Sequence, residues 1–149
     1  MGAEVGTWNE WDCKGQIDWF LLQYPLHQGL FEMIRDLNHF YLKYPVLWED
    51  SDWKGYEWID FSDYERSVIS YLRKGNGKTL ACVHNFTPEL YLNYCISLPK
   101  VKKIKEVFNT DAVQYGGSNQ LNQAIQKDPG HLTLTLSPLA TMIFEVEFD

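Results

Sequence analysis

Apolar residues between Leu26 and Tyr44 recur at spacings of three and four, the period of one stripe of an α-helix. The stripe consists of Leu26, Leu30, Met33, Ile34, Leu37 and Tyr41. Pro45 follows, and proline cannot continue a helix. Residues 1–24 have no sustained period and are predicted to form a loop. Because this segment offers the stripe no partner, we expect the helix to fold back on the rest of the chain, to dimerise or to cause aggregation.

After Pro45 the period becomes two, which is typical of strands with one buried face. Residues 67–73 and 79–86 flank Gly75-Asn76-Gly77, whose Asn-Gly pair favours a tight hairpin. Three further alternating runs have their apolar positions at Leu92, Tyr94, Ile96 and Leu98, at Leu132, Leu134 and Leu136, and at Met142, Phe144, Val146 and Phe148. Short alternating strands separated by turn residues predict a mainly β fold, an antiparallel β-sandwich preceded by a loop and one helix.

Two other segments of the second half are polar. The lysines at positions 100, 102, 103 and 105 surround Val101, Ile104 and Val107, a pattern that predicts an edge strand, because lysines discourage pairing with another chain. Residues 110–130 form a long polar stretch with adjacent glycines at 116 and 117. Long polar loops are usually functional, docked or disordered. We expect the part between residues 109 and 122 to dock one domain on another through Asn, Ser and Tyr hydrogen bonds.

Composition narrows the class of protein. With 149 residues, 45% of them hydrophobic and 22% charged, the chain is long enough for one globular unit with an appendage. A net charge of −7 argues against nucleic-acid binding, and no apolar run is long enough to cross a membrane. The three cysteines have neither disulfide-framework nor zinc-site spacing, which indicates a reducing cytoplasm.

Candidate chemistry is sparse in the residues themselves. Four scattered histidines give no metal-site spacing, so we expect neither metal nor cofactor. Carboxylates gather at Glu49, Asp50 and Asp52 and at Glu57, Asp60 and Asp63, where an acid/base pair is formally possible but a solvated surface is the more ordinary interpretation. Aromatic residues reach 15%, which suits either a packed core or platforms for sugar rings.

Short motifs recur in a fixed order. Met1-Gly2-Ala3-Glu4-Val5-Gly6-Thr7 is followed by Glu10-Trp11 and then by Ile17-Asp18-Trp19-Phe20-Leu21-Leu22. This order and spacing resemble the M-G-N-E-[IF]-[GA]-Q, E-W and L-D-W-x-L-L signature of bacterial 1,4-α-glucan (glycogen) branching enzymes. Matching segments continue over essentially the whole chain: His27-Gln28-Gly29, Asp36-Leu37-Asn38, Pro45-Val46-Leu47, Gly55-Tyr56-Glu57-Trp58-Ile59-Asp60, Ser67-Val68-Ile69-Ser70, Asn85-Phe86-Thr87-Pro88, Asn109-Thr110-Asp111, Tyr115-Gly116-Gly117-Ser118 and Pro138-Leu139-Ala140.

The resemblance implies a C-terminal part of such an enzyme, in the α-amylase superfamily. Residues 1–48 would then be the remnant of a (β/α)8 barrel, comprising the end of its eighth strand, a loop and its eighth helix, and residues 49–149 the C-terminal all-β sandwich. Because barrel active sites lie at the carboxyl ends of the strands, Glu4, Trp8 and Trp11 would lie at the rim of the glucan cleft as candidate substrate-binding residues. Ala3 and Thr7 depart from the family's Asn and Gln.

The chemistry implied is a retaining double displacement, in which a glucan held on a carboxylate passes to a 6-hydroxyl. The family's catalytic carboxylates would precede Met1, so the resemblance implies no catalytic residue in this chain and no activity of the chain alone. The expected partner is an α-glucan, glycogen or amylose. Two alternatives stay open, a non-catalytic glucan-binding module and a β-domain that only stabilises the barrel. They differ in whether Trp48, Trp53 and Trp58 are exposed in a row or buried.

Overall fold

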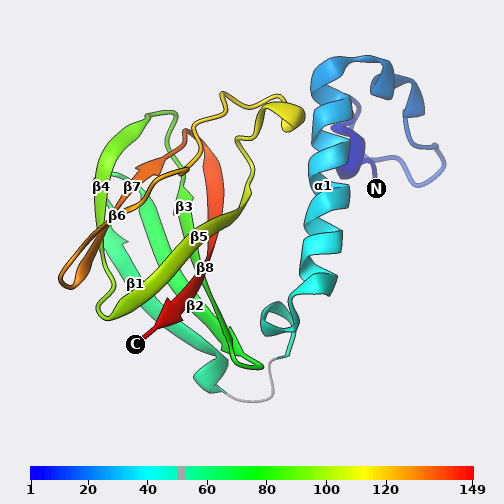
Figure 1. Ribbon diagram of the computed structural model, residues 1–149. Helices are drawn as coiled ribbons and strands as arrows, with labels where there is room; N and C mark the ends of the chain where they lie inside the picture. Colours follow the sequence, from blue (N-terminus) through cyan, green and yellow to red (C-terminus); the bar gives the residue numbers. More distant parts are fainter. Residues whose placement is uncertain (50–52) are drawn as a thin grey trace.

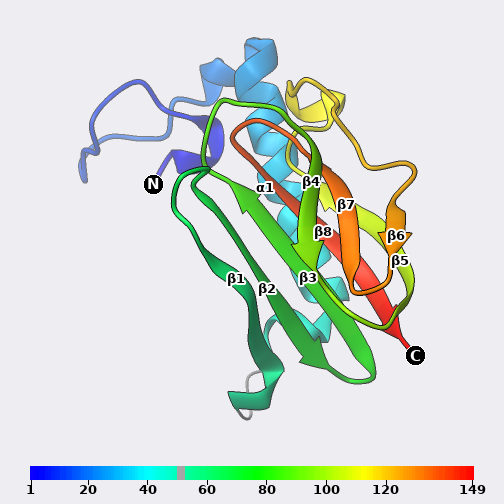
Figure 2. The same ribbon diagram turned by 90° about the vertical axis from the view of Figure 1, so that its left-hand side faces the viewer.

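The computed structural model describes residues 1–49 and 53–149, so Asp50 and Asp52 of the first acidic group lie outside the described residues. A five-stranded sheet, in the order β1-β2-β3-β8-β5, faces a three-stranded sheet, β4-β7-β6, and all pairings are antiparallel (Figure 1, Figure 2). The strands are β1 Tyr56–Asp63, β2 Val68–Gly75, β3 Lys78–Asn85, β4 Tyr91–Ser97, β5 Val101–Asn109, β6 Gln126–Asp128, β7 His131–Leu136 and β8 Ala140–Phe148. The predicted sandwich is confirmed.

The hairpin between β2 and β3 forms as its sequence predicts. Asn76 and Gly77 have φ angles of 49° and 70°, both in the left-handed region that a type I′ turn requires. Gly75 therefore pairs directly with Lys78, and the register continues without a break to Val68 and Asn85.

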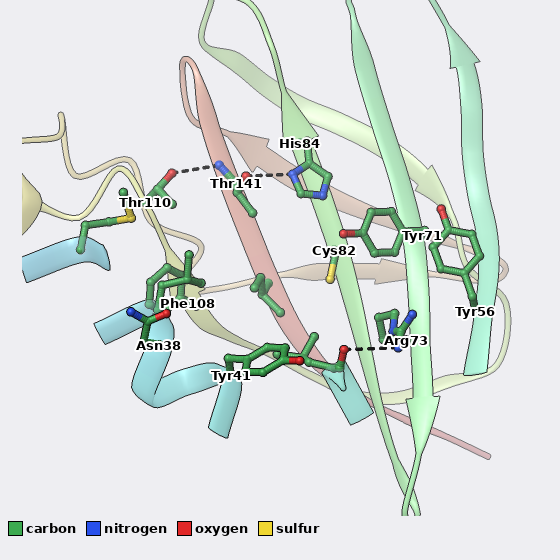
Figure 3. Close-up of a pocket in the computed structure, with 14 residues that line it drawn as sticks. Asn38, Tyr41, Tyr56, Tyr71, Arg73, Cys82, His84, Phe108, Thr110 and Thr141 are labelled. Atoms are coloured by element: carbon green, nitrogen blue, oxygen red, sulfur yellow. Dashed lines mark hydrogen bonds between the residues drawn. The ribbon is translucent and has the colours of Figure 1, made fainter. Parts of the chain in front are cut away.

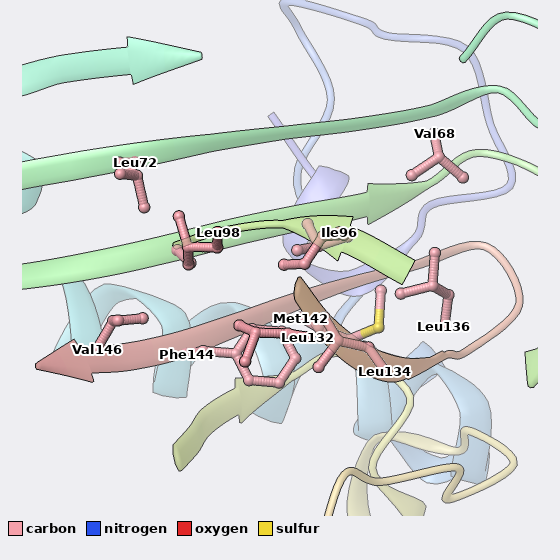
Figure 4. Packing of buried hydrophobic residues seen from close by; sticks show 12 residues of the cluster. Val68, Leu72, Ile96, Leu98, Leu132, Leu134, Leu136, Met142, Phe144 and Val146 are labelled. Carbon is pink, nitrogen blue, oxygen red and sulfur yellow. The ribbon is translucent and has the colours of Figure 1, made fainter. Parts of the chain in front are cut away.

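The main core lies between the two sheets (Figure 4). Leu132, Leu134 and Leu136 alternate along β7 and are almost completely buried, as the period of two predicts. They meet residues of β8 such as Phe144, which has no exposed surface. The two sheets thus share a close-packed apolar layer, the principal source of stability in a β-sandwich.

Bulges break the predicted alternation in two strands. In β4 the register shifts between Tyr91 and Tyr94, and Asn93 has a φ of 57°. An extra residue at a bulge re-aims its neighbours. The prediction that Leu92 faces the core is consequently wrong, since 64% of this residue is exposed and Tyr91 packs on the core instead.

The lysine-rich strand β5 lies at the edge of the five-stranded sheet, as predicted. Its pairing with β8 shifts between Val101 and Lys103 and again between Glu106 and Phe108. The first shift lets Val101 and Ile104, three residues apart, pack on the same core, whereas Val107 packs on the cluster of the opposite face. Two strands were not predicted. No strand was expected at β1, and β6 lies inside the stretch 110–130 that was predicted to be a loop.

Helix α1, Pro25–Lys43, confirms the predicted helix and stands beside the outer face of the five-stranded sheet (Figure 1). No described helix is both long and apolar enough to cross a membrane. Phe40 and Tyr44 pack against Leu80, Phe108 and other residues of that sheet, forming a second buried cluster. The helix has therefore folded back on the sandwich, one of the three expected outcomes.

The helix face that is buried deepest differs from the predicted stripe. Phe40 and Gly29 are the buried residues of α1, whereas Leu37 and Tyr41 remain 37% and 46% exposed and Leu26 remains 70% exposed. The period of the sequence identified the apolar side of the helix. The closest contact with the sheet is made by Phe40, which is adjacent to Tyr41 of the predicted stripe. Aromatic rings at positions 40 and 44, one helical turn apart, supply that contact.

The loop after β5 reaches across to α1, as expected of a docking segment. The 3-10 turn η5, Val113–Tyr115, carries Tyr115, whose hydroxyl donates a hydrogen bond of 3.0 Å to Asp36 Oδ2. At Gly29 an added Cβ would lie 2.6 Å from the Tyr115 carbonyl oxygen, so the two backbones approach closely because Gly29 has no side chain.

Only the tyrosine of this loop bonds to the helix among the described hydrogen bonds; the Asn and Ser residues bond within the sandwich. Buried Asp111 accepts from the Ser118 amide and hydroxyl and from the Gln120 amide, at 2.7 to 3.1 Å. Glu106 accepts from the Asn122 side chain at 2.7 Å. Within the described residues the Asn and Ser side chains thus bond to Asp111 and Glu106 of the sandwich, and the expected bonds to the neighbouring domain stay a prediction.

Replacing Gly29 should separate the loop from the helix. We expect Gly29→Ala to lower the free energy of unfolding by about 1–3 kcal/mol, because the added methyl group overlaps a backbone carbonyl that cannot move freely. Gly75→Ala is the matched control, since its Cβ would make an ordinary contact of 3.5 Å with Val46. Urea denaturation of the three proteins measures the difference. Equal stability of the two variants would contradict the close docking.

Candidate functional site

The N-terminal segment is fixed to α1 at both of its ends. Val5, at the end of the 3-10 turn η1, Ala3–Val5, and Leu21, in the turn η2, Trp19–Gln23, have no exposed surface. His27 Nδ1 lies 2.7 Å from the Val5 carbonyl oxygen, and since a carbonyl only accepts, Nδ1 carries the hydrogen. The residues between the turns form a projecting loop (Figure 1).

The strand end expected at residues 1–4 is not seen as a strand; η1 occupies this place. A strand is held by hydrogen bonds to a neighbouring strand, and η1 instead contacts α1 and η2. Glu4 is half-buried within this turn.

Trp8 belongs to a cluster of rings on the N-terminal half of α1. Its ring centroid lies 6.2 Å from Phe20, 5.5 Å from Tyr24 and 5.3 Å from His27. At the same time 64% of Trp8 is exposed. One side of the indole therefore packs on the helix, and the other side is available to a ligand.

Trp11 lies elsewhere, at a cavity of about 350 Å³ enclosed by the projecting loop. Residues that line it include Thr7, Asn9, Trp11, Gln16, Ile17 and Asp18. The indole is 66% exposed. Neither Glu4 nor Trp8 is among the lining residues, so the structure does not bring the three predicted residues into one site. An exposed indole beside hydroxyl, amide and carboxylate groups is nevertheless a combination that suits a polar ligand with flat apolar faces, such as a sugar.

Asp18 is the residue of this cavity that the sequence interpretation missed. Its Oδ2 accepts hydrogen bonds from Thr7 Oγ1 at 3.0 Å and from Asn9 Nδ2 at 2.9 Å. The signal was present in the Ile-Asp-Trp motif, but nothing in the sequence indicates that the Asp side chain turns back toward residues about ten positions earlier.

A larger cavity of about 610 Å³ separates the middle of α1 from the sheet (Figure 3). Met33, Leu37 and Tyr41 line it from the helix. From the strands it is lined mainly by Tyr56, Tyr71, Arg73, Cys82, His84, Phe108, Thr141 and Ile143. The helix is thus held by the sheet at its C-terminal end and by the loop that carries Tyr115 near Gly29, with a largely apolar space between α1 and the sheet.

Burial favours the neutral forms of three titratable groups of this cavity, Tyr71, Cys82 and His84. Burial raises the pKa of the Cys82 thiol to about 11 and the pKa of the Tyr71 hydroxyl to about 12. Burial also lowers the pKa of His84, whose Nδ1 forms a hydrogen bond of 2.8 Å with Thr141 Oγ1. A thiol with a raised pKa is a poor nucleophile, so the cavity is suited to packing or binding and not to covalent catalysis.

The second acidic group is occupied by structural contacts. Asp63 accepts from the Tyr94 hydroxyl at 2.6 Å and pairs with Arg66 at 3.1 Å. Burial would raise the pKa of Asp63, but these hydrogen bonds outweigh it and lower the pKa. Glu57 pairs with Lys74 across β1 and β2. A general acid needs a raised pKa, whereas the contacts of Asp63 lower its pKa.

Glu106 is a carboxyl group with a raised pKa, and burial is the cause. It nevertheless accepts hydrogen bonds from Asn109 and Asn122 inside the sandwich. The same amides tie β5 to the loop that follows it. Glu106 therefore serves the architecture and is not presented to a substrate.

Aromatic rings also form a continuous surface on β1, β2 and β3, which we call the aromatic surface: Tyr56, Trp58, Phe61, Tyr71, His84 and Phe86. Tyr71 stacks on Tyr56 at 5.1 Å and on His84 at 5.4 Å. Trp58, Phe61 and Phe86 are 46%, 67% and 61% exposed. Trp48 and Trp53 are also exposed, by 44% and 83%. The tryptophans that distinguish the alternatives are thus on the surface.

Comparison with protein families decides the classification of the sandwich. The model of the α-amylase C-terminal all-β domain matches residues 58–147. The chain belongs to this family. The matched residues begin in β1 and end in β8, so they cover both sheets of the C-terminal all-β domain and leave out α1 and the projecting loop.

Relatives of the whole chain extend beyond this domain. The chain is 48% identical to a 1,4-α-glucan branching enzyme of Protochlamydia amoebophila over 98% of its own length and 21% of that protein. It is 41% identical to the branching enzyme of Synechococcus elongatus and 38% identical to that of Oceanobacillus iheyensis, over 98% and 100% of the chain. The chain spans about a fifth to a quarter of the length of these relatives.

Solved structures support the fold of the C-terminal all-β domain. An α-amylase from H. orenii superposes with a TM-score of 0.55 at 21% identity, covering 79% of this chain and 20% of that one. A MutB mutant in complex with glucose gives a TM-score of 0.51 at 22% identity, covering 79% of this chain and 18% of that one. At these identities the likeness concerns the fold alone.

Proposed function

We propose that this chain is the C-terminal portion of a 1,4-α-glucan branching enzyme of the cytoplasm, in which α-1,4-glucan segments are transferred to a 6-hydroxyl of glycogen. The supporting observation is that the similarity to branching enzymes spans 97–100% of the chain. It therefore includes α1 and the projecting loop, which lie outside residues 58–147 of the all-β domain. A shared sandwich alone would leave those residues unmatched.

In this proposal the two parts of the chain have separate tasks. Residues 1–48 contribute the last helix of the catalytic barrel and the loop at the rim of the glucan cleft, where Glu4, Trp8 and Trp11 are the candidate contacts. The sandwich of residues 49–149 covers the outer side of that helix and fixes its position through Tyr115 and through Phe108, on which Phe40 of the helix packs. No acid/base pair is proposed within the chain, because Asp63 and Glu106 are engaged in structural hydrogen bonds.

The first test compares the full-length protein with the 149-residue chain. We expect the full-length protein to lower the iodine staining of amylose and to create α-1,6 linkages, whereas the isolated chain does neither, since binding cannot replace a nucleophile and a general acid. Debranching followed by chain-length analysis measures the new linkages. Turnover by the isolated chain that survives repurification would contradict the proposal, as would a full-length protein without branching activity.

Glucan binding by the sandwich is a second candidate function, favoured by the exposure of the aromatic surface. Aromatic side chains with exposed faces can stack on the C–H faces of pyranose rings. We expect the isolated chain to be retarded in a gel containing amylopectin and Trp58→Ala to lose about half or more of that retardation. Tyr64→Ala is the control, because Tyr64 is 84% exposed but lies outside the aromatic surface. Equal migration with and without amylopectin would refute this function.

Self-association of the isolated chain is a further proposal. Leu26, Leu37, Tyr41 and Leu42 remain between 37% and 70% exposed on α1. Leu37 and Tyr41 line the open cavity between α1 and the sheet, so a second copy that covers this side gains about 25 cal/mol for each Å² of apolar surface that it buries. Sedimentation velocity should show dimers that Leu37→Asp abolishes, whereas His39→Asp, which changes a neighbouring exposed residue, leaves them intact. A monomer at all concentrations would exclude this association.

A further inference from the structure

The geometry points to Asp18 as a positioning residue: through Thr7 and Asn9 it fixes the projecting loop and thereby the place of Trp11 at the 350 Å³ cavity, which we infer to be a glucan subsite. The inference rests on the proposed function, since the ligand is the same α-glucan. The inference adds Asp18 to the candidate site as a residue that acts through Trp11 and does not itself contact the glucan.

The hydrogen bonds of Asp18 close the loop into a ring. Thr7 and Asn9 lie eleven and nine residues before Asp18, and both donate to the same oxygen, Oδ2. Among the described hydrogen bonds of residues 8–17, the others are local, such as those that join Asp12 to Lys14 and Gly15. Without Asp18, no described side-chain hydrogen bond would join the first part of the loop to its last part.

The surroundings of the loop make this link decisive for Trp11. Trp8 packs on the rings beside α1, but the residues from Asn9 to Gln16 are exposed and packing holds them little. Val5 and Leu21, by contrast, are fully buried at the two anchored ends. A side chain on an exposed segment presents its ring to a ligand with little loss of entropy only when that segment is already ordered. Asp18 supplies this order from within the cavity wall.

Thr7 has two contacts that can be separated by substitution. Its hydroxyl donates to Asp18, and its methyl group lies beside Gly2, where an added Cβ would come within 3.1 Å of Thr7 Cγ2. Valine keeps the methyl contact and removes the hydroxyl. Serine keeps the hydroxyl and removes the methyl group.

The experiment uses the full-length protein and two readouts, the dissociation constant for maltoheptaose by calorimetry and the KM and kcat for amylose. We expect Thr7→Val to weaken maltoheptaose binding and raise KM by about three- to tenfold, the loss that corresponds to the net contribution of one ordinary hydrogen bond. The increase in KM should exceed the decrease in kcat. Thr7→Ser should restore both constants to within about twofold.

Two further variants test whether the effect runs through Trp11. Asn9→Ala removes the exposed second bond and serves if Thr7→Val does not fold. In a double-mutant cycle, Thr7→Val and Trp11→Ala should not be additive, because both remove the same ring from the glucan. Additive effects would overturn the positioning role. So would unchanged binding in Thr7→Val and Asn9→Ala alongside weak binding in Asp18→Asn, since Asp18 would then contact glucan directly.

The two proposals fail in different ways. A wild-type protein without branching activity refutes the proposed function, yet the calorimetric comparison of the variants still decides the role of Asp18. If the wild-type protein branches amylose, and Thr7→Val has the same dissociation constant for maltoheptaose and the same KM as the wild type, only the positioning role is refuted.

Discussion

The five-stranded sheet is apolar on both faces, and each face has to be covered. In β3, four consecutive residues, Leu80, Ala81, Cys82 and Val83, are at most 2% exposed. The same holds in β8, where Met142, Ile143 and Phe144 follow one another at 5% exposure or less. Consecutive buried residues occur only in a strand that is covered on both sides. The second sheet covers one face, and α1 with its flanking segments covers part of the other.

This constraint explains why the helix lies where it does. The rings of Phe40 and Tyr44 settle on the outer face of the sheet at one end of α1. At the other end, the missing side chain of Gly29 lets the backbone of Tyr115 approach. Between these points the helix does not reach the sheet, which leaves the apolar cavity of about 610 Å³. Contact at both ends fixes the helix axis, although its middle is not packed.

The fold could be predicted from the sequence where one local rule governed the outcome. Helix α1, the hairpin at Asn76 and the alternation of β7 followed from period, turn chemistry and burial. The errors arose where a non-local contact decided. A bulge at Asn93 exposed Leu92, and the strand β1 went unnoticed because its residues are mostly exposed and carry no clean alternation. Periodicity predicted an antiparallel sandwich. The resemblance to branching enzymes added that this sandwich is of the α-amylase C-terminal type.

The candidate site was predictable to a lesser extent. The resemblance drew attention to Trp8 and Trp11, and both are exposed, but they point to different surroundings. Asp18 was missed because its hydrogen bonds to Thr7 and Asn9 depend on how the loop turns back. Local sequence carries little information about such a return. Half-buried Glu106 and buried Asp111 were missed for a similar reason, since each binds amides that are brought near it only by the folded loop.

The position of Cys82 has a consequence for the chemical behaviour of the chain. Its thiol lies 2% exposed beneath α1, and burial raises its pKa to about 11, whereas Cys13 and Cys95 are exposed. Alkylating reagents attack thiolates that they can reach. Modification of Cys82 therefore has to wait for the helix to lift from the sheet. Cys82 should therefore be labelled more slowly than Cys13 and Cys95. The rate of its labelling reports how often the contact between the helix and the sandwich opens, and no added probe is needed.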